Sequence, residues 1–186
     1  MAPVTPQAGS HSAHRARITR PNNGGVFIDC RLSIELVPKP CWSLSLCNRL
    51  VKSAWDELRE EVFRKAGQRC EIRGGAGPLH CHEICKYDDL RHSQKLIGLI
   101  AICKLCHRVK HLGHASILAE QGIISLDRVA RHYMKVNHVR RAEYDADVEM
   151  AFARWKIRSQ HEWSTDFGKW THLVETRSKR KYAQNP

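Results

Sequence analysis

The chain has 186 residues, and its 31 Lys and Arg against 19 Asp and Glu give a formal net charge of +12 at pH 7. A hydrophobic content of 42% is enough for a buried core, which excludes collagen-like, coiled-coil and wholly disordered chains. No stretch of about 18 apolar residues and no apolar leader is found, so we expect a cytoplasmic protein without a membrane span. In such a protein, eight Cys and twelve His predict thiols and metal ligands in place of disulfides.

Two arms are expected to flank one folded domain. Residues 1–25 are rich in Pro, Gly, Ser and Asn and lack apolar periodicity, which predicts a disordered N-terminal arm. Residues 175–186 carry four basic side chains against one acidic side chain, which predicts a basic tail that either aids solubility or contacts phosphate. The folded domain is therefore expected over residues 26–174.

Regular elements are expected directly after the N-terminal arm. Apolar and polar residues alternate over 31–37, which predicts a half-buried strand. An amphipathic helix follows, with Ser53 as its N-cap and Gly67 as its C-terminal stop. Two apolar runs, 79–84 and 96–102, then predict a pair of strands.

The C-terminal part of the chain is expected to be helical. One helix is predicted to begin near Cys106, and Ser125 offers an N-cap for the next. Apolar side chains recur on one face over 140–159, which predicts a further helix that packs in the core. Strands and helices in this order predict an α+β fold.

A cysteine pair with metal-ligand spacing lies after the second predicted strand. Cys103 and Cys106 form a C-x2-C pair, a spacing that lets two thiolates reach one tetrahedral Zn²⁺ at about 2.3 Å each. Cys70 stands where a second pair would begin, but the position of its partner is held by Arg73, which cannot ligate. These three cysteines predict a structural zinc site, and the alternative is that they are small buried side chains. A water or one of three side chains could supply the fourth ligand: His80, Cys81 or Cys85.

Histidines surround the same cysteine pair. His107 and His111 are four residues apart and share one face of the expected helix, while His82 and Glu83 lie in the first of the two strands. Such a set contains the parts for metal-assisted hydrolysis, since a neutral His can take a proton from water while other groups hold a divalent cation against a phosphate oxygen. An isolated His on a helix usually faces solvent, so it is the joint placement that favours a site.

One continuous pattern from residue 82 to residue 111 joins these features: H-E-I-x-x-Y-D-D-x2-H-x-Q-K-L-x-G-L-x-A-x-C-x2-C-H-x2-K-H. With shorter matches on both sides, the pattern extends over about 31–172 and resembles the HNH endonucleases of the ββα-metal type, closest to a group of bacterial proteins of about this length. The resemblance implies a core over about 68–115, in which a two-stranded ribbon and a helix clasp one divalent cation. An N-terminal strand and helix and C-terminal helices would flank this core.

The resemblance also implies an activity, the hydrolysis of phosphodiester bonds in DNA. It makes His82 the candidate general base and Glu83 its neighbour on the metal or the water, with the two roles open to exchange. His107 and His111 become the candidate ligands on the helix. The expected cofactors are a divalent cation (Mg²⁺, Mn²⁺ or Ni²⁺) and the structural Zn²⁺.

The central block is expected to contact the DNA backbone. Residues 67–118 carry eight basic and four acidic side chains, a net charge of +4. Lys104, Arg108 and Lys110 lie on the predicted helix and are expected to meet phosphates without reading bases.

Three positions depart from the family's pattern. Arg73 replaces a zinc ligand, Gly98 stands where many family members have Asn, and Cys85 replaces a bulky aromatic residue. These departures favour an alternative, a catalytically impaired, zinc-ribbon-like protein that binds nucleic acid. A third hypothesis is a protein-interaction module with Trp163 and Trp170 as exposed anchors.

Overall fold

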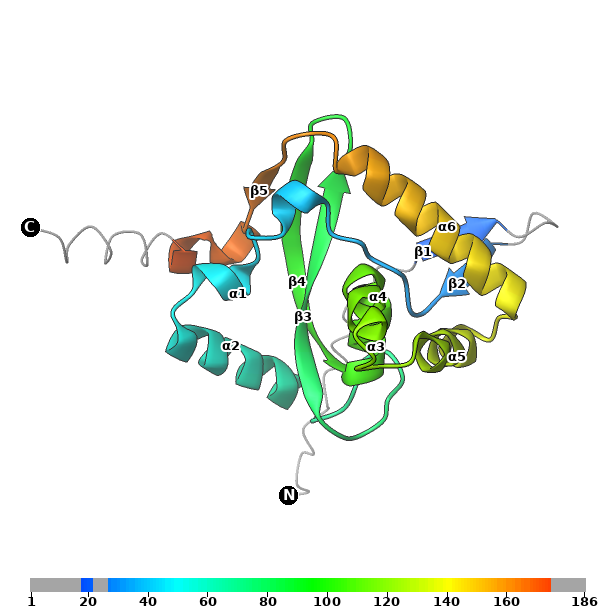
Figure 1. The fold of residues 1–186 in the computed structure, drawn as a ribbon. Helices are drawn as coiled ribbons and strands as arrows, with labels where there is room; N and C mark the ends of the chain where they lie inside the picture. Colours follow the sequence, from blue (N-terminus) through cyan, green and yellow to red (C-terminus); the bar gives the residue numbers. More distant parts are fainter. Residues whose placement is uncertain (1–17, 22–26, 175–186) are drawn as a thin grey trace, which may run out of the picture. The chain divides into compact units, whose positions relative to one another are not determined.

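The computed structural model describes residues 18–21 and 27–174 and divides into two compact units, Met1–Arg31 and Leu32–Pro186 (Figure 1). In the first unit, β1 (Ile18–Pro21) pairs with β2 (Phe27–Cys30) in antiparallel register. The predicted disordered arm, 1–25, thus contains one strand, and its other residues lie outside the described ranges, as does the predicted basic tail.

The second unit is built around a long β-hairpin. Strands β3 (Leu79–Asp88) and β4 (Ser93–Cys103) are antiparallel, and the short β5 (Ser164–Asp166) adds to β4 in parallel. The prediction of an α+β fold is confirmed at this level, and so are the two strands, which run several residues beyond their apolar runs. Strand β5 was not predicted, because its Ser-Thr-Asp sequence has no apolar alternation.

Two helices precede the hairpin. They are the short α1 (Leu46–Arg49), which follows a 3-10 turn at Lys39–Cys41, and α2 (Lys52–Lys65). The predicted amphipathic helix is therefore confirmed, although its N-cap is Val51 and not Ser53. The helix ends as predicted at Gly67, whose φ of 61° is favourable only for glycine.

Four helices follow the hairpin: α3 (Lys104–Lys110), α4 (Leu112–Glu120), α5 (Leu126–Asn137) and α6 (Arg141–Arg158). Figure 1 shows α2 on one side of the hairpin and α3 and α4 on the other. The Ser125 side chain caps α5 as predicted, by accepting a hydrogen bond from a backbone N–H of the first turn. None of the helices in the described residues is both long and apolar enough to cross a membrane.

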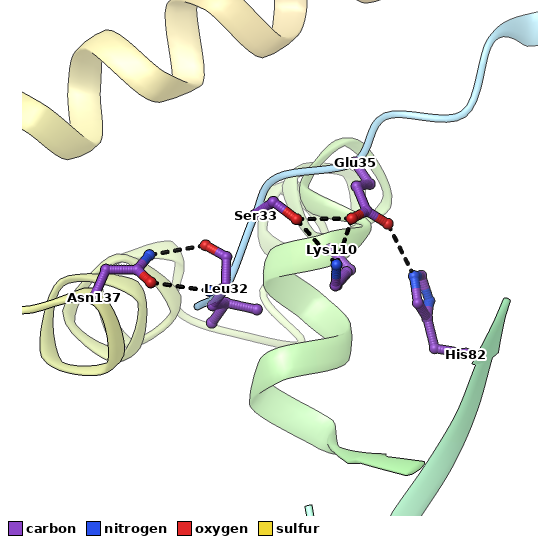
Figure 2. Close-up of polar contacts among 6 residues, drawn as sticks. All are labelled: Leu32, Ser33, Glu35, His82, Lys110 and Asn137. Atoms are coloured by element: carbon purple, nitrogen blue, oxygen red, sulfur yellow. Dashed lines mark hydrogen bonds and ion pairs between the residues drawn. The ribbon is translucent and has the colours of Figure 1, made fainter. Parts of the chain in front are cut away.

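The segment 31–37 is extended but forms no strand, so the strand predicted there is wrong. Its backbone is held instead by the Asn137 side chain, which accepts from the N–H of Leu32 at 2.9 Å and donates to the C=O of Leu32 at 2.8 Å (Figure 2). The N–H of Glu35 donates to the C=O of Lys110 at 2.9 Å. The alternation of apolar residues is not matched by alternating burial, because Leu32 is fully buried and residues 33–37 are all half-buried.

The two tryptophans near the C-terminus belong to the interior. Trp163 and Trp170 are each only 7% exposed, and Trp170 lies in the 3-10 turn Gly168–Trp170 and packs in a core with Leu46, Leu50 and Leu96. They are therefore not the exposed anchors that a protein-interaction module would need.

Candidate metal centres

Three imidazoles converge beside the hairpin. His82 comes from β3, His107 from α3, and His111 from the residue between α3 and α4. Their ring centroids lie 5.6 Å (His82 to His107), 4.9 Å (His82 to His111) and 4.7 Å (His107 to His111) apart. One ring nitrogen of each lies within 4.8 Å of the others, so the group could hold a metal ion. We call these three residues the histidine cluster.

Burial keeps two members of the histidine cluster uncharged. Desolvation, helped by the neighbouring imidazoles, lowers the pKa of His107 to about 3. Desolvation and the proximity of His82 lower the pKa of His111 to about 4. Both rings are therefore neutral near pH 7, the form in which an imidazole nitrogen ligates a metal.

Glu35, which the sequence analysis missed, lies directly beside the cluster. Its Oε2 is 3.2 Å from Nε2 of His82, and its Oε1 forms an ion pair with the Lys110 ammonium (Figure 2). Ser33 donates to Oε1 of Glu35 at 2.7 Å and accepts from Lys110 at 3.0 Å. Burial alone would raise the pKa of Glu35, but the hydrogen bond from His82 and the charge of Lys110 hold this pKa well below its usual value. Glu35 is thus a carboxylate.

Because Glu35 is ionised, it decides which ring nitrogen of His82 carries the proton. A carboxylate can only accept, so Nε2 of His82 carries the proton and Nδ1 keeps a lone pair. That Nδ1 is buried, in a side chain that is only 3% exposed, and it has no hydrogen-bond partner among the residues that the structure describes. A buried polar atom without a partner is costly, and a cation or a polarised water would satisfy it. A His with a carboxylate on its other nitrogen is also the usual arrangement around protein-bound metals, so these residues fit a divalent cation.

Glu83 lies apart from the histidine cluster. Its carboxylate accepts hydrogen bonds from the backbone N–H groups of Leu46 and Cys47, at 3.0 and 3.3 Å, in the first turn of α1. Glu83 lines the same cavity as the three histidines, but its carboxylate does not belong to the group of ligand atoms that lie within 4.8 Å of one another. The carboxylate bonded to the histidine cluster is that of Glu35.

Three cysteine sulfurs form a second group. Cys70, Cys103 and Cys106 are all buried, and their sulfur atoms lie within 4.8 Å of one another, so the group could hold a metal ion. Hydrogen bonds from Cys106 and Cys70 hold the pKa of Cys103 well below its usual value. Nε of Arg73 also donates to the Cys103 sulfur, at 3.1 Å. None of the residues expected to supply a fourth ligand, namely His80, Cys81 and Cys85, belongs to this group among the described residues.

The predicted phosphate contacts divide into two kinds. Lys104 is exposed and Arg108 is half-buried, and both lie near His80, whose ring stacks on His107 with 4.9 Å between centroids. These two cations therefore flank the histidine cluster. Lys110 is 6% exposed and bound to Glu35 and Ser33, so its prediction as a nucleic-acid contact is corrected: the ammonium is an internal partner of Glu35.

The histidine cluster opens into a cavity of about 630 Å³. Its wall includes Glu35 and all three histidines, and the remaining wall is largely apolar. Six Phe, Trp and Tyr side chains contribute to the wall: Trp42, Trp55, Tyr87, Phe152, Trp155 and Phe167. The volume lies in the range of ordinary ligand pockets, so a small molecule or part of a polymer can enter beside the three histidines.

Comparisons of the chain with models of protein families, with curated proteins and with solved structures find no match. What the two centres do is therefore inferred from their own residues and geometry.

Proposed function

We propose that the protein is a divalent-metal-dependent endonuclease of the HNH type that hydrolyses phosphodiester bonds in DNA. The observation that carries the proposal is the convergence of His82, His107 and His111 where a β-hairpin meets the helix that follows it. This order of two strands and a helix is what the sequence resemblance leads one to expect. The net charge of +12 supports a polyanionic substrate.

His107 and His111 would hold the cation through their neutral rings. A bound divalent cation supplies charge stabilisation at the scissile phosphate and at the leaving oxygen. The three side chains whose ligand atoms lie within 4.8 Å of one another are all imidazoles, since Glu83 is bonded to α1 and Glu35 to His82 and Lys110. Imidazole suits Ni²⁺ and other transition metals better than Mg²⁺, which prefers oxygen ligands.

His82 is the candidate general base. Its Nδ1 has the free lone pair and can take a proton from an attacking water. Glu35 accepts the hydrogen bond from Nε2, which fixes the ring orientation and stabilises the positive charge that the ring gains. Lys110 in turn keeps Glu35 ionised through their ion pair.

Lys104 and Arg108 are suited to bind the DNA backbone next to this site. They are one helical turn apart on α3, and both lie near His80, which stacks on the cluster. Guanidinium and ammonium groups bind phosphate oxygens without regard to base sequence. Because these two side chains bind only phosphates, we expect them to add little preference for the base sequence at the cleavage site.

Cleavage of plasmid DNA tests the proposal. The purified protein is incubated with supercoiled plasmid and Mg²⁺, Mn²⁺ or Ni²⁺, with a chelator as blank. We expect metal-dependent nicking or linearisation that His82→Ala reduces by at least about 100-fold, the usual contribution of a general base. His161→Ala is the matched control, since His161 is exposed and stacks on His92 outside the cluster. Cleavage that survives His82→Ala, or none with any metal, contradicts the proposal.

A second candidate function is nucleic-acid binding without catalysis. The orientation of Glu83 favours it, since the predicted carboxylate is missing from the cluster. This function predicts DNA binding whose log affinity falls steeply with log salt, and no cleavage in any metal. Binding measured across salt concentrations, alongside the plasmid assay, distinguishes the two functions.

A further inference from the structure

Three vertices of a tetrahedral metal site are occupied by cysteine sulfurs. The sulfurs of Cys70 and Cys106 lie 3.8 Å apart, and Cys103 completes the group. Bonds of about 2.3 Å from zinc to sulfur place two sulfurs of a tetrahedron about 3.8 Å apart, so the observed separation is that of two thiolates on one ion. The fourth ligand has to come from elsewhere, because Arg73 holds the C-x2-C position after Cys70.

His132 reaches the cysteines from α5. Its Nε2 lies 3.2 Å from the Cys106 sulfur. Helix α5 packs against α3, which brings His132 to Cys106 across 26 residues of chain. Zinc bonds of about 2.0–2.1 Å to nitrogen and 2.3 Å to sulfur give a nitrogen-to-sulfur edge of about 3.5 Å. The imidazole is already at this edge length from Cys106, but it lies outside the group of sulfurs within 4.8 Å of one another, so it has to move by more than about 1 Å toward the other two sulfurs to complete the tetrahedron.

Arg73 fits the same site in a different role. Three thiolates and one neutral imidazole around Zn²⁺ carry a single net negative charge, and the guanidinium that donates to Cys103 at 3.1 Å balances it. Hydrogen bonds to ligand atoms from outside the first set of ligands are a regular feature of metal sites. Arg73, which stands where the fourth cysteine was expected, thus stabilises the thiolates of the other three cysteines.

We propose that the chain holds one structural Zn²⁺ between Cys70, Cys103, Cys106 and His132, with Arg73 as a hydrogen-bonded partner of Cys103. The ion would join the loop after α2, the end of β4, α3 and α5. Because α3 carries His107 and is followed directly by His111, the zinc would fix this part of the histidine cluster on the hairpin. The zinc site does not depend on nuclease activity, so it can be tested separately.

Zinc content and affinity of the full-length protein provide the first test. We expect the purified protein to contain about one zinc per chain by mass spectrometry. His132→Ala is expected to lower zinc affinity, measured against a chromophoric chelator, by more than about 100-fold, which exceeds the loss caused by removing an outer-shell partner. Arg131→Ala changes the neighbouring, exposed residue of α5 and is expected to keep wild-type affinity.

Cobalt substitution provides a second test that does not require the alanine variant to fold. His132→Cys keeps four ligands but exchanges a nitrogen for a sulfur, so we expect it to bind Co²⁺ with stronger thiolate-to-metal absorption than wild type. Three results would overturn the proposal: wild-type zinc affinity in His132→Ala, an unchanged cobalt spectrum in His132→Cys, or a wild-type protein that takes up neither metal.

Discussion

Nε2 of His82 donates a hydrogen bond to Oε2 of Glu35 across 3.2 Å and joins two segments that lie 47 residues apart in the chain. Glu35 belongs to the extended segment before α1, and His82 belongs to β3. Lys110, from α3, binds the other oxygen of Glu35. This carboxylate therefore couples the N-terminal segment, the hairpin and the helix that carries His107.

Glu35→Gln tests this coupling. The substitution keeps the shape of the side chain but leaves the Lys110 ammonium buried without its anion. Breaking a buried ion pair costs about 3–5 kcal/mol, and because Glu35 is 31% exposed we expect a loss of about 2–3 kcal/mol in the free energy of unfolding by urea. Glu35→Gln with Lys110→Met is expected to recover most of the loss, since the second change removes the unpaired charge.

The Glu35→Gln variant also separates the effect of Glu35 on catalysis by His82 from its effect on the stability of the fold. The carboxylate stabilises the positive charge that His82 gains when it takes a proton from water, so its loss is expected to lower the rate of DNA cleavage. The rate of the double variant is expected to stay low, although its stability recovers. A rate that recovers together with stability would show that Glu35 acts on folding alone.

Acid is expected to destabilise the metal-free protein between about pH 6.5 and pH 4. His107 and His111 have pKa values of about 3 and 4 in the folded state, below the ordinary value of 6.5. In this window the unfolded chain binds more protons than the folded chain, so stability is present above pH 6.5 and is lost as the pH falls. Urea unfolding in the presence of chelator measures how steeply the free energy of unfolding falls as the pH is lowered. His107→Leu is expected to make this dependence on pH less steep. An unchanged dependence in that variant would contradict the lowered pKa of His107.

Glu83→Gln is expected to leave both cation affinity and cleavage close to wild type. The Glu83 carboxylate accepts from two backbone N–H groups at the start of α1, and Gln keeps one acceptor oxygen. The substitution is expected to lower the free energy of unfolding by about 1 kcal/mol, the usual size of a capping effect. His111→Ala, in contrast, is expected to abolish Ni²⁺ binding measured by titration calorimetry. A Glu83→Gln variant that also loses the cation would place Glu83 among the ligands.

The sequence predicted the residues whose relation depends on local geometry. His107 and His111 are four positions apart, and the hairpin that carries His82 precedes them directly, so short-range spacing was sufficient. Glu35 and His132 come from distant segments that packing alone brings together, and no spacing rule relates them to their partners. Glu83 lines the same cavity as His82, but its carboxylate is bonded to the first turn of α1, a partner that the local sequence does not indicate.

The segment 31–37 was misjudged for a related reason. Its alternation indicated one buried face, but only Leu32 is fully buried, and Ile34 and Leu36 are half-buried like the polar residues between them. The hydrogen bonds that hold it, however, come from the Asn137 side chain and from the end of α3, and neither leaves a trace in the local sequence. Periodicity in this segment therefore predicts neither the burial of each side chain nor what satisfies the backbone.

Arg73→Cys should convert the cysteine group into a site with four thiolates. The position follows Cys70 at the C-x2-C spacing, so the new sulfur can reach the ion held by Cys103 and Cys106. In a His132→Ala background, we expect Arg73→Cys to restore zinc affinity to within about tenfold of wild type, since the number of ligands returns to four. Arg73→Ser removes the guanidinium without adding a good ligand and is expected to restore nothing. If both substitutions restored zinc affinity equally, the fourth ligand would be a water and not His132. Rescue by Arg73→Cys alone would confirm that removing His132 vacates one vertex of the zinc tetrahedron.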